Sequence, residues 1–126
     1  MVYLECVMEL KRLEFMSSSL DDLRGFPDKV KKDIGYALYK IQVGMKPKRA
    51  KLLKGFVGAG VLELIENHFG NTYRAVYTVR FKDAVYVLHC FQKKSKSGIK
   101  TPQHEIDLIR QRLRMAEERY KFWRWQ

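Results

Sequence analysis

The chain has 126 residues, of which 25 are lysine or arginine and 14 are aspartate or glutamate, so its formal net charge is +11. This length suits a single domain with its own core, and a hydrophobic content of 46% excludes a disordered basic tail. The charge favours nucleic acid as the partner class, although a solubilising surface or an acidic protein partner would also explain it.

The first half of the chain predicts a short strand and two helices. Residues 12–16 favour a strand, and Ser19 and Asp22 have the spacing of a capping box for a short helix after it. Pro27 is suited to the first turn of a longer helix over residues 28–43, whose apolar residues recur at helical spacing.

The second half predicts a small sheet followed by a helix. A basic, glycine-containing loop over residues 45–60 leads into strand-like runs at 61–67, 72–80 and 84–91, which are separated by segments of hairpin length. The run AVYVLHCF is apolar on both faces, as in an interior strand. Thr101 is predicted as the N-cap of a long last helix, with Pro102 in its first turn and an apolar stripe of Ile106, Ile109, Leu113, Ala116 and Tyr120.

These elements predict an α+β domain with a small antiparallel sheet. We expect a three-stranded meander plus a short N-terminal strand, with the helices packed on one face and the other face left for function. The aromatic tail, residues 121–126, either packs onto this domain or contacts a partner.

The sequence shows no motif for a metal site or for a redox-active pair of cysteines. The three histidines, His68, His89 and His104, have no ligand spacing, so no metal or cofactor is expected. The two cysteines are far apart and form no CxxC, which fits a reduced, cytoplasmic setting. We identify neither a secretion signal nor a membrane span.

Cationic side chains are the strongest candidates for a site. Period-two alternation places Arg74 on the opposite face of its strand from Tyr73 and Tyr77. A buried arginine there requires either an ion pair, with Glu63 or Glu66, or a polar groove. Lysine pairs also lie in the loop that enters the sheet and at the exit of its last strand, where they could converge on a phosphate or remain solvated.

A resemblance joins these features. The sequence resembles toxins of the RelE/ParE superfamily, in particular the phage-derived HigB-like branch of type II toxin–antitoxin systems. The similarity spans roughly residues 10–120, with residues 1–9 as an N-terminal extension and Met8 as an alternative start. It rests on KLLKG at 51–55, Glu63-Leu64, YRAVY at 73–77, VLHCFQKKS at 87–95, Thr101-Pro102 and Glu105-Ile106.

The resemblance implies a RelE-like fold and a ribosome-dependent mRNA endonuclease. Such toxins need no metal, because the 2′-hydroxyl of the substrate attacks the adjacent phosphate. The implied partners are the ribosome, mRNA and a cognate helix-turn-helix antitoxin. A base, an acid and cations that stabilise the phosphate would perform the reaction.

The resemblance also implies roles for individual residues. Arg74 would stabilise the phosphate, Lys93 and Lys94 would contact it or transfer a proton, and Lys54 would hold the backbone or act as base. RNA backbone contacts are expected from Lys51, Lys96, Lys100 and Arg49. Less direct candidates are His89, which its strand phase places in the core with Val85, Val87 and Phe91, and Tyr77 and Tyr86, which either stack on a base or pack.

One departure from the family pattern makes activity uncertain. Many relatives carry an arginine after the Glu-Leu pair, where this chain has Ile65. Two other functions therefore stay open: a non-catalytic toxin that inhibits gyrase, as ParE does, and an inactive basic domain of phage origin that binds nucleic acid or protein.

Overall fold

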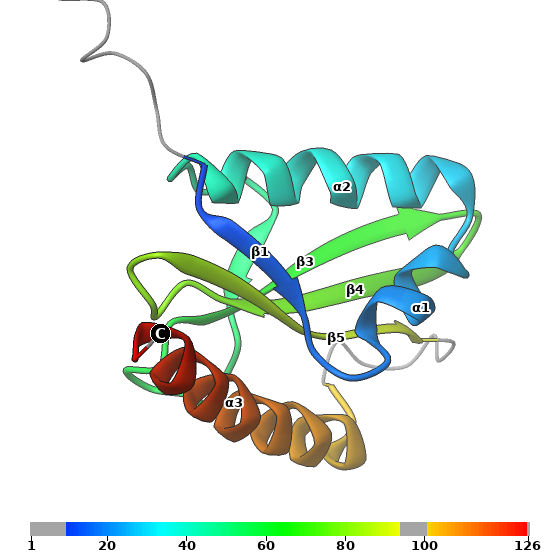
Figure 1. Ribbon diagram of the computed structural model, residues 1–126. Coiled ribbons are helices and arrows are strands. Elements are labelled where there is room, and N and C mark those ends of the chain that lie inside the picture. The colour runs from blue at the N-terminus through cyan, green and yellow to red at the C-terminus, as the bar shows by residue number, and fades with distance from the viewer. Residues whose placement is uncertain (1–9, 94–100, 126) are drawn as a thin grey trace, which may run out of the picture.

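The structure is a computed structural model that describes residues 10–93 and 101–125. In chain order its elements are β1 (Arg12–Phe15), α1 (Ser19–Arg24), α2 (Asp28–Gln42), β2 (Ala50–Leu52), β3 (Val61–His68), β4 (Asn71–Thr78), β5 (Ala84–Lys93) and α3 (Gln103–Arg124). The strands build one twisted sheet between the two long helices (Figure 1).

The sheet is mixed, with the strand order β1-β5-β4-β3-β2. The predicted meander forms from β3, β4 and β5, which pair antiparallel, and β2 extends it beyond β3. The N-terminal strand β1 pairs parallel to β5. This confirms the predicted α+β class, and β5 is an interior strand, as its apolar pattern indicated.

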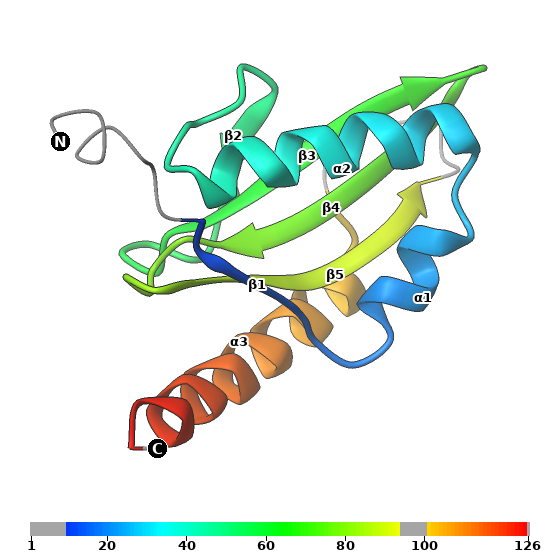
Figure 2. The same cartoon turned by 45° about the horizontal axis from the view of Figure 1, so that its top comes forward.

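Helices cover both faces of the sheet, which corrects the predicted single covered face. Figure 2 shows α2 and α3 on opposite sides of the strands. One core cluster joins α2 to residues such as Leu64, Ala75 and Val87, and a second joins α3 to Val61, Val76 and Tyr86. Because β5 carries apolar side chains on both faces, each face requires a cover.

A β-bulge in β5 changes which side chains share a face. Tyr77 pairs with Val87 and Val76 pairs with His89, so Leu88 is the extra residue. Val85 and Val87 therefore point toward α2, whereas His89 and Phe91 lie on the α3 face. The predicted grouping of His89 with both valines is wrong because strict alternation fails across the bulge.

Two predicted helix caps are also corrected. The residue before α1 is Ser18, and the Ser19 hydroxyl instead donates to the carbonyl of Val87 at 3.2 Å. The residue before α3 is Pro102, while the Thr101 hydroxyl accepts a hydrogen bond from Arg74 Nη1 at 3.3 Å. In both places a long-range contact replaces the local cap.

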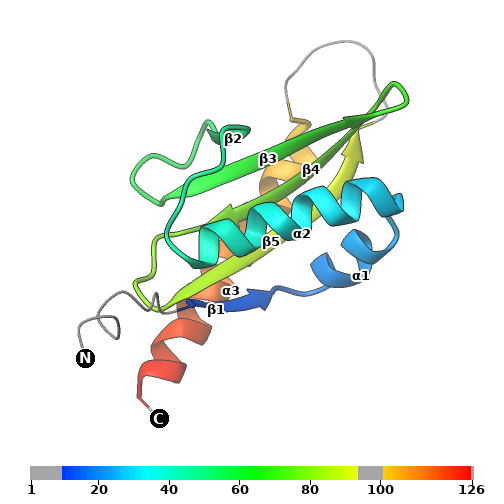
Figure 3. The same ribbon diagram turned by 90° about the horizontal axis from the view of Figure 1, so that it is seen from above.

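Helix α3 crosses beneath β5 and β1, and its last turn contains part of the aromatic tail (Figure 3). Arg119 reaches Glu14 on β1 at 3.2 Å, and the guanidinium of Arg12 lies 4.0 Å from the ring centroid of Trp123. Trp125 is 87% exposed. The tail is thus partly packed onto the domain.

Candidate functional site

The candidate site is a group of buried polar side chains on the α3 face of the sheet. At its centre Arg74 Nη1 lies 3.1 and 3.0 Å from the two carboxylate oxygens of Glu63, in the ion pair that the sequence left open. Arg74 is 3% exposed and Glu63 is 8% exposed. A charge so deep requires a partner of opposite sign, because burying it alone costs several kcal/mol.

Strand register aligns further cations with this pair. Lys51 lies directly opposite Glu63 on the neighbouring strand, and Lys93 lies opposite Thr72, two residues before Arg74. Arg74 is therefore the diagonal neighbour of both Glu63 and Lys93, at about 7–8 Å between Cα atoms. Lys93 is buried, whereas Lys51 is exposed at the rim.

The loop between β2 and β3 adds a rim to this face. Lys54 is exposed at its start, and Arg110 of α3 donates to the carbonyl of Gly55 at 3.3 Å and covers the ring of Phe56. The structure thus brings Lys51, Arg74 and Lys93 to one face, with the loop of Lys54 beside them. Lys94, Lys96 and Lys100 lie outside the described residues.

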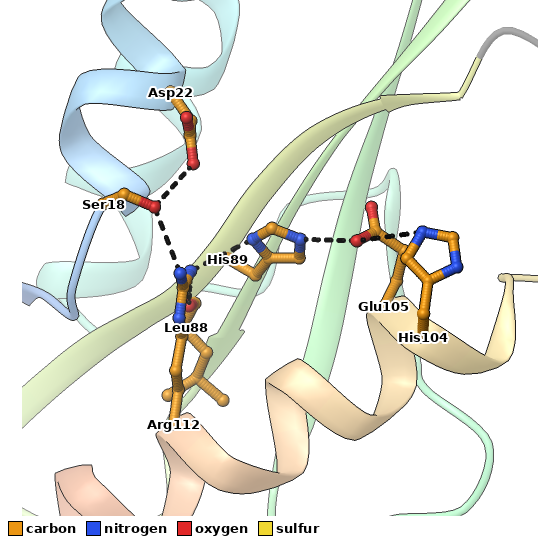
Figure 4. Close-up of polar contacts among 7 residues, drawn as sticks. All are labelled: Ser18, Asp22, Leu88, His89, His104, Glu105 and Arg112. Atoms are coloured by element: carbon orange, nitrogen blue, oxygen red, sulfur yellow. Dashed lines mark hydrogen bonds and ion pairs between the residues drawn. The ribbon is translucent and has the colours of Figure 1, made fainter.

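His89 is buried, with its ring stacked on Phe91 and both ring nitrogens in a polar network (Figure 4). Its Nε2 lies 3.1 Å from Oε1 of Glu105, and its Nδ1 lies 3.1 Å from Nη1 of Arg112. Because arginine only donates, Nδ1 must accept, so the proton of neutral His89 resides on Nε2 and is donated to Glu105.

The same contacts keep His89 neutral. Burial lowers the pKa of His89, and the hydrogen bond to Glu105 only partly opposes this effect. Protonating Nδ1 would also place its N–H against the N–H of Arg112. His89 is thus a positioning group between β5 and α3, with both nitrogens occupied.

The network continues from Arg112 to α1. Arg112 Nη1 donates to the carbonyl of Leu88 at 3.0 Å, and its Nη2 donates to the Ser18 hydroxyl at 3.1 Å. Ser18 in turn donates to Asp22 at 3.0 Å. The extra residue of the bulge therefore has its carbonyl satisfied by α3, and one arginine connects the sheet to both helices.

At the other end of the network, the exposed side chain of His104 approaches the same carboxylate. Its Nε2 lies 3.6 Å from Oε1 of Glu105. The first turn of α3 thus carries an ionisable pair close to Thr101, which contacts Arg74.

Other candidates do not join this group of polar side chains. Tyr77 is buried on the α2 face, where burial raises its pKa to about 12. Arg49 pairs with Glu66 at 3.1 Å, and Glu66 lies opposite Tyr73, which also belongs to the α2 face. Tyr86 is fully buried in the α3-side core. The two tyrosines therefore pack.

Ile65 occupies the middle of the candidate site. It pairs directly with Arg74 across β3 and β4, and it is half-buried. An arginine at this position, which the sequence resemblance implies for many relatives, would stand beside Arg74. This chain has an apolar side chain there instead.

Sequence reasoning missed Glu105 and Arg112, although a signal was present. Together with Ile109 and Ala116 they recur at helical spacing, so two charged residues interrupt an apolar stripe. Charges on the buried face of a helix predict partners within the protein.

Within residues 10–93 and 101–125, no group of three histidine, cysteine, aspartate or glutamate side chains could hold a metal ion. None of the helices in this part of the chain is long and apolar enough to cross a membrane.

The architecture is that of the RelE toxin fold. The isolated E. coli RelE toxin superposes with a TM-score of 0.55 at 18% identity, covering 69% of this chain and 88% of the toxin. A double arginine-to-alanine mutant of E. coli RelE in the free state gives a TM-score of 0.51 at 20% identity, covering 64% and 81%.

The family follows from the sequence match. Residues 21–114 match the family described as "Phage derived protein Gp49-like (DUF891)". The chain belongs to this Gp49-like family of phage-derived proteins. No curated protein matches the sequence.

Proposed function

We propose that the chain is the toxin of a type II toxin–antitoxin system and acts in the cytoplasm as a ribosome-dependent mRNA endonuclease. The observation that carries the proposal is the register of β2, β4 and β5, which brings Lys51, Arg74 and Lys93 to one face of a RelE-like sheet. Its partners would be mRNA, the ribosome and a helix-turn-helix antitoxin.

The proposed reaction is a transesterification within the RNA. A base removes the proton of a 2′-hydroxyl, the resulting oxygen attacks the adjacent phosphorus, and the bond from phosphorus to the 5′-oxygen breaks. An acid returns a proton to that oxygen, leaving a 2′,3′-cyclic phosphate and a 5′-hydroxyl. Arg74 and Lys93 would stabilise the charge that builds on the phosphate, and Lys54 or Lys94 would serve in proton transfer.

The burial of Arg74 makes a specific demand on this reaction. Glu63 and Thr101 both contact Nη1 of Arg74, so phosphate would have to replace one of these contacts to bind that nitrogen. The same burial supports the second candidate, a basic binding domain without catalysis, in which the ion pair is only structural. Ile65 supports that candidate too, because it leaves this face with one cation fewer.

Expression in a bacterial host separates the candidates. We expect growth arrest, with mRNA cut at positions in phase with codons on translating ribosomes. Intact mRNA with trapped gyrase would instead support a ParE-like toxin, and normal growth would support the inactive domain. Either result would refute the endonuclease.

Variants test the residues. Arg74→Lys keeps the positive charge but removes the planar guanidinium, which can donate two hydrogen bonds to one phosphate. We expect this variant to reduce the cleavage rate at least about tenfold. The Lys93→Ala/Lys94→Ala double variant should likewise reduce cleavage. Its matched control is Lys29→Ala/Lys32→Ala, which removes two exposed lysines from α2. Circular dichroism checks that each variant folds. A folded Lys93→Ala/Lys94→Ala variant that cleaves at the original rate would refute the assignment.

A further inference from the structure

A hollow of about 240 Å³ lies on the α2 face, away from the candidate site. The end of α2 and the following turn supply Ile41, Gly44 and Met45. Leu62 of β3, Tyr77 of β4 and Val79, which follows β4, line the other side. Lys11 and Lys46 complete the lining. The hollow therefore has an apolar floor and two cations at its margin.

Tyr77 gives this hollow an unused hydrogen-bond donor. The tyrosine is 1% exposed and lines the hollow, and its hydroxyl makes no hydrogen bond to any residue in 10–93 or 101–125. Since burial raises the pKa of Tyr77 to about 12, the hydroxyl keeps its proton at neutral pH. An occupant with an oxygen acceptor would satisfy it.

Exposed apolar side chains extend the surface beyond the hollow. Met45 is 55% exposed and Val79 is 37% exposed, and both line it. Leu52 is 70% exposed and pairs across β2 and β3 with Leu62 of the floor. Such a grouping favours a peptide segment over a bare phosphate, because it offers contact area for several apolar side chains.

We propose that the N-terminal segment, residues 1–9, docks on this surface. Its sequence MVYLECVME combines apolar residues with Glu5 and Glu9, which complement Lys11 and Lys46. The segment joins the described chain at Leu10, next to Lys11 on the margin of the hollow, and nine residues can span up to about 30 Å. A chain starting at Met8 would leave the same surface uncovered. This inference does not depend on the endonuclease proposal.

Two hydrogen bonds between Lys11 and Gln42 fix one margin of the hollow. The backbone N–H of Lys11 donates to the carbonyl of Gln42 at 3.0 Å, and the Gln42 side chain donates to the carbonyl of Lys11 at 2.7 Å. Lys11 is thus fixed at the end of α2, on the margin of the hollow.

Methyl NMR of the full chain and of a chain beginning at Met8 tests the proposal. We expect the methyl signals of Met45, Leu62 and Val79 to differ between the two chains, and the full chain to show cross-peaks from them to Tyr3 or Leu4. The methyl signals of Val57, on the loop between β2 and β3, should coincide. Identical spectra for the hollow in both chains would refute docking.

Charge variants and isotope mixing sharpen the test. Lys46→Glu should remove at least about half of the shift differences, while Lys48→Glu, an equal charge change outside the hollow, should leave them intact. Equal effects of both variants would refute the proposed recognition. Cross-peaks between labelled and unlabelled molecules would also overturn the proposal, because they assign the surface to a second copy.

Discussion

The ion pair between Arg74 and Glu63 makes the sharpest prediction for the fold. The substitution Glu63→Gln keeps the size of the side chain and removes its charge, so the buried guanidinium loses its carboxylate. Breaking a buried pair from one side typically costs 3–5 kcal/mol, and Arg74 retains its contact with Thr101. We therefore expect the free energy of unfolding to fall by about 3 kcal/mol.

Urea denaturation at neutral pH measures this loss. For a slope of roughly 2 kcal/mol per molar, the midpoint should fall by roughly 1.5 M. The matched control is Glu66→Gln, on the same strand, whose partner Arg49 has a side chain 63% exposed. That substitution should cost less than about 1 kcal/mol, because solvent screens the exposed partner.

Replacing both charged residues separates two effects: the cost of leaving Arg74 buried without its carboxylate, and the net contribution of the ion pair to stability. The double variant Glu63→Met/Arg74→Met removes both charges of the pair, so it should recover most of the stability lost in Glu63→Gln. The reasoning would be refuted if Glu63→Gln cost no more than Glu66→Gln. It would also be refuted if the double variant were less stable than the single one.

Three further predictions concern the pH dependence of stability, the substitution of Ile65 and the two buried tyrosines. Folding lowers the pKa of His89, so as the pH falls below about 6.5 the unfolded chain binds this proton before the folded chain does. The free energy of unfolding, measured by urea titration, should therefore decrease from pH 7.5 to pH 5.5. It should decrease less in the variant His89→Gln. Ile65→Arg should raise the mRNA cleavage rate by up to about tenfold in primer-extension assays, and unchanged or weaker cleavage would contradict the proposed cation deficit. Tyr86→Phe should cost about 1 kcal/mol in thermal denaturation, because its oxygen accepts a hydrogen bond from Arg12 at 2.9 Å. In a chain that begins at Met8, Tyr77→Phe should cost less, because its hydroxyl has no hydrogen-bond partner within residues 10–93 and 101–125; equal losses would contradict this difference.

Patterns with a fixed period could be predicted from the sequence. Apolar spacing gave α2 to within a residue, and the alternation in β4 placed Arg74 and Tyr77 on opposite faces, as observed. Both patterns depend only on local backbone geometry. The candidate ion pair with Glu63 also followed from the hairpin.

The remaining features depend on contacts between distant segments. A bulge is an insertion in one strand relative to its neighbour, so nothing in AVYVLHCF alone reveals that Leu88 is the extra residue. The two cap predictions were wrong for the same reason, because the hydroxyls of Ser19 and Thr101 form hydrogen bonds with strands that are distant in sequence. The second covered face was implied by the apolar β5, but the side taken by α3 required the structure.

Glu63 and Arg74 belong to the candidate site and also stabilise the fold. Glu63 holds Arg74 in one position, which orients the guanidinium before any substrate arrives. In the proposed reaction, the same carboxylate would compete with phosphate for that guanidinium. Removing it should therefore weaken the fold and strengthen RNA binding at once, the trade-off expected where a functional charge is kept at a cost in stability. Loss of activity in a folded Arg74 variant would therefore identify a defect in the proposed reaction. Loss of activity in a Glu63 variant would reflect either a folding defect or lost orientation of Arg74, and a denaturation measurement on the same variant separates the two.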